Sequence, residues 1–339
     1  MKTMSLVQVH GVDEVRIDAV DVPEIGPDDA LIKVAACGIC GSDLGYIAQG
    51  GITAPGVPMP LGHELSGTIA ALGENVRHLA VGQKVTVNPM ANGHAIGNGG
   101  AEGGFAPLLR VRDAASVAEA ILPLPAGMSF DEAALIEPLS VAMHGVHQSG
   151  IEAGQSALVM GAGPIGLCTV LVLKYYGVER IVVADKSAMR LQLARQLGAE
   201  AVCNVQESDL ENCLREAHGE AAVMGMPVPG TDVYIEATGV GSVLELAIGL
   251  ARTGATIVVV GVHKAPIEFH PLTLLIKELR LLGAMAYPRE FPQVIEMLQG
   301  GTVDVAPLIS HHFELKDFDK ALAVAQDPER AAKVMITMI

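Results

Sequence analysis

The 339-residue sequence predicts a two-domain α/β protein in which a partly open β-barrel precedes a doubly wound parallel sheet. Three observations carry this prediction. The chain is longer than most single domains. Its first part, residues 1–149, holds short β-branched runs among many Gly and Pro residues, with sparse helical periodicity. After Gly150, apolar runs alternate with longer amphipathic segments, which is the pattern of a parallel sheet covered by helices.

Composition and charge exclude several classes of protein. Hydrophobic residues make up 50% of the chain, but only 3% of residues are aromatic, so aliphatic side chains and Met must fill the cores. The formal net charge of −16 argues against nucleic-acid or anionic-membrane partners, because both repel an acidic protein that has no Lys/Arg run. No signal peptide or membrane span is apparent, so a cytoplasmic location is expected. Five unevenly spaced cysteines predict reduced thiols.

The expected elements follow from these patterns. Short strands are expected at residues 30–34 and 84–87 of the barrel. The sheet strands are expected at residues 156–160, 180–184, 201–204, 232–236, 256–260 and 280–284, and the helices at residues 165–176, 188–197, 210–217, 242–251 and 271–277. Residues 219–230 contain two prolines and three glycines and predict a surface loop. From residue 291 the chain leaves the sheet pattern, which gives a first domain of residues 1–149 with 286–339 and a second of residues 150–285.

A glycine-rich turn joins the first expected sheet strand to its helix. Gly161 allows the tight turn, Gly163 lets the backbone approach a pyrophosphate, and Gly166 permits close packing of helix on strand. The turn, with Pro164 and Ile165, therefore predicts a dinucleotide site; the alternative is an ordinary glycine-rich connection.

Asp185 ends the second expected strand, where an acidic group accepts hydrogen bonds from the adenosine ribose and repels a 2′-phosphate. NAD is therefore predicted over NADP, although Lys186 and Arg190 are near enough in sequence to weaken that preference. The alternative role for Asp185 is that of an acidic residue at a helix N-terminus.

A second group of residues predicts a metal centre. Cys40, His63, Glu64 and Glu137 offer a thiolate, an imidazole and carboxylates, which are zinc ligands. A catalytic zinc uses three protein ligands and leaves one position open, whereas a structural zinc closes it. Gly62-His63-Glu64 alone is a weak signal, because an exposed turn can produce it.

Taken together, the motifs resemble those of the zinc-containing medium-chain dehydrogenase/reductases, particularly the sorbitol, butanediol and threonine dehydrogenase branch. The resemblance spans almost the whole chain and rests on segments in the family's order: residues 37–43 (CGICGSD), 62–64 (GHE), 136–141 (IEPLSV), the glycine turn and 236–239 (EATG). It implies a GroES-like barrel for the first domain and a Rossmann sheet for the second.

The resemblance assigns roles around the metal. Cys40 and His63 match the zinc ligands, while Cys37 falls where the family varies and is expected in the core. A redox dithiol is the alternative for this cysteine pair. Of Glu64 and Glu137, one is expected to ligate zinc and the other to orient a water.

Two further residues match the family's supporting roles at the metal. Asp43 matches the carboxylate that orients the zinc-bound histidine, and Ser42 matches the hydroxyl that passes on the alcohol proton. A loop cap and a turn residue are their alternative roles.

The resemblance also extends the expected cofactor and substrate sites. Thr238, Val260, Val262 and Ala284 are expected to line the cofactor, and Tyr46 and Tyr287 the substrate. Ala286 stands where polyol-oxidising relatives have an arginine, which favours a butanediol-type substrate. Core packing is the alternative for Tyr287, and a half-buried aromatic of the barrel is the alternative for Tyr46.

Residues 88–105 lack the four cysteines that hold a second, structural zinc in many relatives, so one catalytic zinc is expected. His94 in this segment is expected to be solvated.

The expected activity is reversible, NAD- and zinc-dependent oxidation of a secondary alcohol, of vicinal diol, polyol or hydroxy-amino acid type, to a ketone. The alternatives are a zinc-free NADPH-dependent quinone or enoyl reductase of the same superfamily and a non-catalytic nucleotide-binding protein. The resemblance also implies a homodimer or homotetramer, formed through the last sheet strand.

Overall fold

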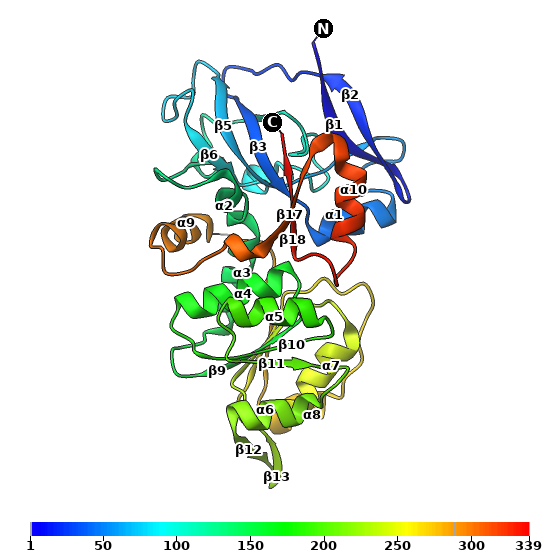
Figure 1. Cartoon of the computed structure of the whole chain (residues 1–339), viewed down its shortest axis with the longest axis vertical. Coiled ribbons are helices and arrows are strands. Elements are labelled where there is room, and N and C mark those ends of the chain that lie inside the picture. The colour runs from blue at the N-terminus through cyan, green and yellow to red at the C-terminus, as the bar shows by residue number, and fades with distance from the viewer. Residues whose placement is uncertain (1, 288, 339) are drawn as a thin grey trace. The chain divides into compact units, whose positions relative to one another are not determined.

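The computed structural model describes residues 2–287 and 289–338, which form two compact units (Figure 1). Unit 1 comprises Met1–Glu137, Ile309–Asp327 and Lys333–Ile339, and unit 2 comprises Pro138–Leu308 and Pro328–Ala332. The domain boundaries expected from the sequence, at residues 150 and 286, stay a prediction.

Unit 1 is built on a mostly antiparallel seven-stranded sheet in the order β17-β18-β3-β5-β6-β8, with β7 also paired to β3. Its central strand β3 buries Ala30, Ile32 and Val34, the period-2 pattern of a strand with one face in the core. A second, three-stranded sheet has the order β2-β1-β4. The strands are β1 (Thr3–Gly11), β2 (Glu14–Asp21), β3 (Ala30–Gly38), β4 (Met59–Pro60), β5 (Glu64–Leu72), β6 (Lys84–Val87), β7 (Leu108–Val111), β8 (Ile121–Pro123), β17 (Ile309–Glu314) and β18 (Lys333–Thr337).

Unit 2 contains the predicted doubly wound sheet, six parallel strands in the order β11-β10-β9-β14-β15-β16. The order reverses beside β9, which is the switch point where such sheets bind ligands. Helices α4 (Pro164–Tyr175) and α5 (Ala188–Gln196) lie on one side of the sheet, and α6 (Leu210–His218) and α7 (Gly241–Leu250) lie on the other (Figure 1). The strands are β9 (Ser156–Met160), β10 (Arg180–Asp185), β11 (Ala201–Asn204), β14 (Val233–Glu236), β15 (Thr256–Val259) and β16 (Arg280–Gly283). The predicted α/β fold class is confirmed.

The helices of unit 2 begin at recognisable caps. The Ser187 side chain accepts the Arg190 N–H at the start of α5, and Asp209 accepts that of Asn212 at the start of α6. The helices that begin in unit 2 are α4 (Pro164–Tyr175), α5 (Ala188–Gln196), α6 (Leu210–His218), α7 (Gly241–Leu250), α8 (Pro271–Lys277) and α9 (Phe291–Gln299), and those of unit 1 are α1 (Gly41–Gln49), α2 (Phe130–Ala134) and α10 (Phe318–Ala325).

The prediction of a surface loop at residues 219–230 is wrong. This segment forms a β-hairpin of β12 (Glu220–Val223) and β13 (Met226–Pro229) below α6 (Figure 1). Met224 and Gly225 both have positive φ, as a two-residue hairpin turn requires. The prolines that suggested a loop are tolerated because both strands of a two-stranded ribbon are edges. Arg215 of α6 fixes the hairpin through Glu220 and the Pro227 carbonyl, at 2.6 and 2.8 Å.

One long helix, α3 (Ile136–Ser149), is not predicted by the sequence patterns. Its first two residues belong to unit 1 and the rest to unit 2. Pro138 near its start suggests a break, but proline fits the first turn of a helix, where its missing N–H has no partner to lose.

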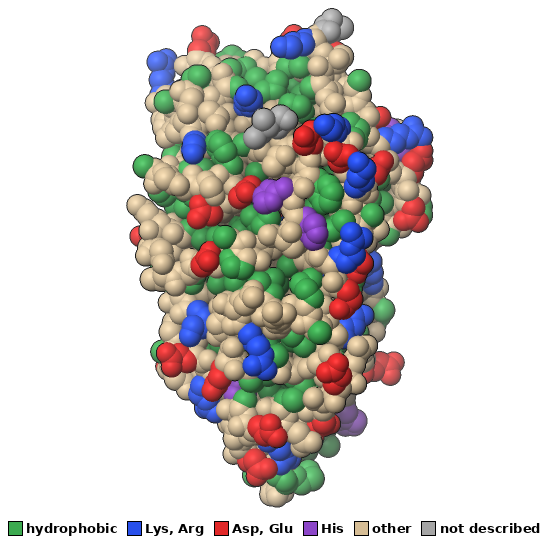
Figure 2. Space-filling model, viewed as in Figure 1, with side chains coloured by type: hydrophobic (Ala, Val, Ile, Leu, Met, Phe, Trp, Pro, Cys, Tyr) green, Lys and Arg blue, Asp and Glu red, His purple; other side chains and the backbone are tan. Residues whose placement is uncertain are grey.

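On the face drawn in Figure 2, Lys and Arg side chains are interspersed with Asp and Glu. The described residues form no large basic patch on this face, which agrees with the acidic net charge of the chain. Among the described residues, no helix is both long enough and apolar enough to cross a membrane.

Candidate active site

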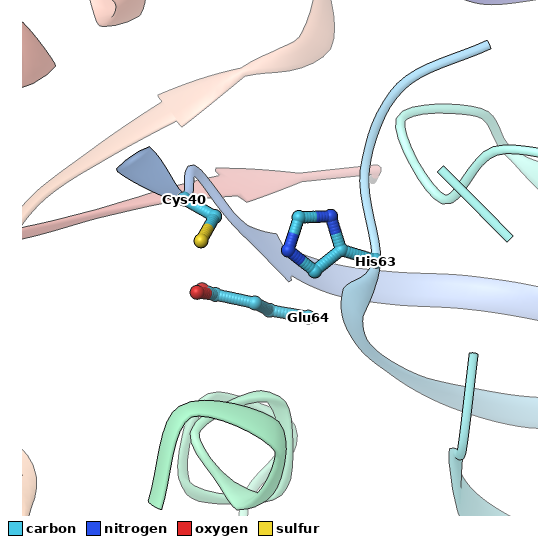
Figure 3. A group of neighbouring side chains, drawn as sticks. All are labelled: Cys40, His63 and Glu64. Carbon is cyan, nitrogen blue, oxygen red and sulfur yellow. The ribbon is translucent and has the colours of Figure 1, made fainter. Parts of the chain in front are cut away.

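Three of the four predicted metal ligands converge in unit 1. Cys40 caps the start of α1, His63 immediately precedes β5, and Glu64 is the first residue of β5. One ligand atom from each side chain lies within 4.8 Å of the other two, and the side chains point toward one another (Figure 3). Adjacent positions of β3 and β5 bring the two segments together, because Gly38 pairs with Glu64.

Gly62 is required for the placement of His63. Its φ is +92°, a conformation that side chains rarely adopt, and a Cβ there would lie 2.6 Å from the Phe105 backbone nitrogen. The glycine therefore lets the chain pass close to Phe105 and turn the imidazole toward Cys40.

His63 is held between two polar side chains. Its Nδ1 lies 3.6 Å from Asp43 Oδ1, and its Nε2 lies 3.3 Å from Ser42 Oγ. Asp43 is fully buried, and its other oxygen accepts the Cys40 N–H at 2.8 Å. The structure thus places both Ser42 and Asp43 beside His63, with Asp43 facing the nitrogen that a metal on Nε2 would leave free.

The electrostatics of this centre favour a cation. Burial lowers the pKa of His63, but Asp43, Cys40 and Glu137 together raise it well above its usual value. Burial likewise raises the pKa of Asp43, against the opposing effect of His63. Within the described residues, Asp43 Oδ1 and His63 Nδ1 are buried without a hydrogen-bond partner. A thiol, an imidazole and carboxylates in an anionic, buried cluster fit a zinc ion.

The two candidate carboxylates are in different surroundings. Both oxygens of Glu64 accept hydrogen bonds from Lys333 Nζ at 2.6 Å. Glu137, at the second position of α3, is also buried and is near enough to raise the pKa of His63.

Lys333 is the site residue that the sequence patterns did not predict. The available signal is its position as the single charge in the apolar run of residues 331–336 (AAKVMI). A lysine inside a buried strand requires a partner, and Glu64 is that partner.

Two further residues near the site, Tyr46 and Cys37, differ in their burial. Tyr46 of α1 is half-buried and donates its hydroxyl to Asn98 at 3.1 Å, and burial raises its pKa. Cys37 is fully buried on β3, and burial raises the pKa of its thiol well above the usual value. A thiol in that state is a core side chain and a poor nucleophile.

The expectation that His94 is solvated is wrong. Its side chain is only 9% exposed, and its nearest ionic neighbour is Asp113 at 3.9 Å. Both ring nitrogens are buried and lack a hydrogen-bond partner among residues 2–287 and 289–338. The glycine-rich composition suggests an open loop, but the segment folds back on itself through backbone hydrogen bonds from Gly97 and Gly100.

The glycine turn of unit 2 has the shape that a dinucleotide requires. Gly161 has a φ of +99°, and a Cβ on Gly166 would lie 1.8 Å from the Gly161 carbonyl oxygen. A Cβ on Gly163 would meet no atom within 4 Å, so the backbone is open there. Gly163 also caps α4, and Pro164 and Ile165 begin the helix whose N-terminus faces this space.

Asp185 lies against this turn at the end of β10. One of its oxygens accepts the Ala162 N–H at 2.6 Å, and the other accepts that of Ser187 at 2.8 Å. The Arg190 guanidinium donates to the Ala331 carbonyl at 2.9 and 3.0 Å.

The other predicted cofactor residues follow the carboxyl ends of three neighbouring strands. Thr238 comes after β14, Val260 and Val262 after β15, and Ala284 after β16. Buried Glu236 organises the first of these turns by accepting the Thr238 N–H at 2.7 Å and facing His263 at 2.9 Å. Tyr287 is buried and packs on Phe291, with ring centroids 5.1 Å apart.

Two family models match the chain. A zinc-binding dehydrogenase model matches residues 164–300, and an alcohol dehydrogenase GroES-like domain model matches residues 26–123. A sorbitol dehydrogenase of Pongo abelii is 34% identical over 92% of this chain and 90% of its own length.

Solved structures agree with this assignment. A 2R,3R-butanediol dehydrogenase from Bacillus subtilis is 29% identical, with a TM-score of 0.88 over 99% of this chain and 100% of its own. A Sinorhizobium meliloti protein bound to NADP is 28% identical, with a TM-score of 0.86 over the full length of both chains. The chain therefore belongs to the zinc-binding medium-chain dehydrogenases and is an alcohol or polyol dehydrogenase of the sorbitol dehydrogenase type.

Proposed function

We propose that this protein catalyses the reversible, NAD-dependent oxidation of a secondary alcohol to a ketone at one catalytic zinc. The observation that carries the proposal is the convergence of Cys40, His63 and Glu64 within 4.8 Å in a chain that also has an open glycine turn. The first group offers ligands to a metal, and the second offers backbone N–H groups to a pyrophosphate.

Each residue at the metal has a separate proposed role. Cys40 and His63 hold the metal, and either Glu64 or Glu137 completes the set. Zinc supplies Lewis-acid activation of the substrate hydroxyl when bound. Asp43 keeps the His63 ring in orientation, and the Ser42 hydroxyl accepts the alcohol proton and passes it on.

NAD is the proposed cofactor because Asp185 stands at the turn where a 2′-phosphate would have to fit. An additional dianionic group beside a carboxylate is repelled. Lys186 and Arg190 are the two cations near enough in sequence to offset this repulsion. The Arg190 guanidinium is directed to the Ala331 carbonyl, and Lys186 is exposed. The NADP in the Sinorhizobium meliloti relative makes NADP the competing cofactor.

A vicinal diol of the butanediol type is the proposed substrate. Ala286 lacks the charge that would hold several polyol hydroxyls, and Tyr46 is a half-buried aromatic three residues after Asp43. The structural likeness to a butanediol dehydrogenase supports this choice, while the sorbitol dehydrogenase relatives keep a polyol as the second candidate.

A panel of secondary alcohols, vicinal diols, polyols and L-threonine with NAD and with NADP tests both choices by absorbance of the reduced cofactor. We expect the highest kcat/KM for a vicinal diol with NAD, at least about tenfold above NADP, a ratio worth about 1.4 kcal/mol. Activity with L-threonine and with no other substrate of the panel would contradict the proposal that the substrate is a vicinal diol. Reduction of a quinone or enoyl substrate by NADPH, without any alcohol oxidation, would contradict the whole proposal.

The chain is also proposed to form a homodimer or homotetramer through β16, the terminal strand of the unit 2 sheet. On α8, the neighbouring helix in the sequence, Leu272, Leu275 and Ile276 are exposed, with Leu275 at 73%. A strand at the edge of the sheet and exposed aliphatic side chains on the helix that precedes it favour association with a second copy.

Leu275→Asp should shift the protein toward monomer in sedimentation velocity, because the interface would have to bury an unpaired charge. The matched control is Met224→Asp at the tip of the hairpin, where the exposed fraction is 79%. Equal dissociation by both variants, or by neither, would contradict an interface at β16 and α8.

A further inference from the structure

Glu236 is a completely buried carboxylate at the carboxyl end of β14 in unit 2. Its Oε1 accepts the N–H of Thr238 at 2.7 Å, the hydroxyl of the same residue, and the N–H of Gly239 at 3.1 Å. Its Oε2 lies 2.9 Å from His263 Nε2. An ionised carboxylate can only accept, so this imidazole nitrogen carries a proton and donates it.

Through these bonds one carboxylate joins the turns that follow two neighbouring strands. Thr238 and Gly239 belong to the turn after β14, and His263 belongs to the turn after β15. The two turns are in close contact, since a Cβ on Gly261 would lie 2.2 Å from the Gly239 nitrogen and 2.7 Å from Glu236 Oε2. A glycine at position 261 therefore leaves room for the carboxylate between the turns.

The turn after β14 also contacts the glycine turn after β9. A Cβ on Gly161 would lie 2.8 Å from Thr238 Cγ2. The strand order β9-β14-β15 places the three turns side by side at the carboxyl edge of the sheet, where folds of this kind bind dinucleotides. The bonds of Glu236 thus extend from the proposed pyrophosphate site to the turn that carries Val260 and Val262.

His263 holds the far end of that third turn. The N–H groups of Val260 and Gly261 donate to the Glu236 carbonyl and fix the start of the turn, whereas the imidazole fixes its end. Between these two attachments, Val262 is 76% exposed, as is expected of a side chain that a bound cofactor covers.

Without the imidazole, the buried carboxylate would be poorly satisfied. Oε2 would keep a single bond of 3.3 Å from the Gly239 N–H, which Oε1 already shares. A buried charge with so weak a partner is costly, so the Glu236 side chain would rotate toward other donors and the two turns would move with it.

We propose that His263 is a positioning residue for the dinucleotide, which holds the turn after β15 in its cofactor-lining conformation by donating to Glu236. The inference rests on the proposed function in taking the carboxyl edge of this sheet as the NAD site. It adds to that site a residue that the sequence motifs do not assign. Its effect falls on cofactor affinity and leaves the metal centre unchanged.

His263→Gln and His263→Asn test this in the full-length, zinc-loaded protein. The glutamine amide nitrogen reaches about as far as the imidazole Nε2 and keeps the bond to Glu236, whereas the asparagine side chain is one carbon shorter and loses it. By NADH fluorescence, we expect the Kd of NADH to stay within about twofold of the parent for His263→Gln. It should rise about tenfold for His263→Asn, the effect of one hydrogen bond to a charged group. Equal NADH affinity of the two variants, whether strong or weak, would overturn the proposal.

The kinetic parameters separate cofactor positioning from general damage. His263→Asn should raise the KM for NAD about tenfold, while the KM for the alcohol and the zinc content stay within about twofold of the parent. Arg252→Leu is the matched control, because it removes the ion pair with Asp232 at the opposite, amino end of β14. This control should lower Tm but change NADH affinity by less than about twofold. If it weakens NADH binding as much as His263→Asn does, lost stability explains both results and the proposal fails.

NADH binding needs no alcohol, so a failure of the proposed reaction is read separately. A parent protein that binds NADH but oxidises no alcohol would contradict the proposed reaction, and the two His263 variants would still decide the positioning role. Titration with NADPH serves in the same way if the parent prefers that cofactor. A parent that binds neither would contradict both proposals.

Discussion

Cys40→Ser is expected to abolish alcohol oxidation and zinc binding while leaving binding of NADH unchanged. The thiolate is the only soft ligand among the three side chains that converge at the site, and a serine hydroxyl stays protonated and binds zinc weakly. Loss of a Lewis acid that contributes several kcal/mol predicts a fall in turnover of about 10³-fold or more. Metal analysis of the purified protein should fall from about one zinc per chain to almost none.

Cys37→Ala is the matched control for Cys40→Ser. Cys37 belongs to the same Cys-x-x-Cys segment, but its side chain is fully buried on β3. Its removal leaves a small cavity that costs about 1 kcal/mol of stability and does not touch the metal ligands. Zinc content and turnover should therefore match those of the parent. Equal loss of activity in both variants would favour a dithiol function, and full turnover by Cys40→Ser would remove zinc from the mechanism.

The fold class and the shape of the glycine turn were predictable because their signals are local. The strand at residues 201–204 and the helix at residues 271–277 begin and end where the sequence predicts, since apolar period and flanking residues suffice to define them. The glycine turn is equally local, because its tight conformation and close packing leave glycine as the only fit.

What the sequence could not supply is the contact between distant segments. Lys333 lies far along the chain from Glu64, and only the pairing of β18, β3 and β5 brings them together. The hairpin at residues 220–229 was missed for a different reason. Proline and glycine suggest a loop in a sequence, but on a ribbon with two free edges they are compatible with strands.

The buried position of His94 was missed for a third reason. Composition predicts how polar a segment is on average, but it does not show which side chain the folded loop encloses. Errors of this kind concentrate in irregular segments, where backbone hydrogen bonds between particular residues decide exposure.

Gly166→Ala is expected to have the largest effect on unit 2. The new Cβ would lie 1.8 Å from the Gly161 carbonyl oxygen, so the turn and the start of α4 must separate. Overpacking of this kind costs about 1–3 kcal/mol or more. For a domain of the size of unit 2 each kcal/mol lowers Tm by about 2–4 °C, so differential scanning fluorimetry should show a fall of several degrees. NADH binding should be lost with the geometry of the turn.

Gly163→Ala is the control that separates folding from cofactor binding, because a Cβ there meets no atom within 4 Å and the backbone φ of −67° suits alanine. Its Tm should therefore stay within about 2 °C of the parent, since no packing changes. NADH affinity should nevertheless fall about tenfold or more, equivalent to about 1.4 kcal/mol, because the methyl group occupies the space through which the pyrophosphate approaches the backbone. If Gly163→Ala binds NADH as tightly as the parent, the open space at this turn is not the pyrophosphate site, and the dinucleotide must lie elsewhere on the carboxyl edge of the sheet.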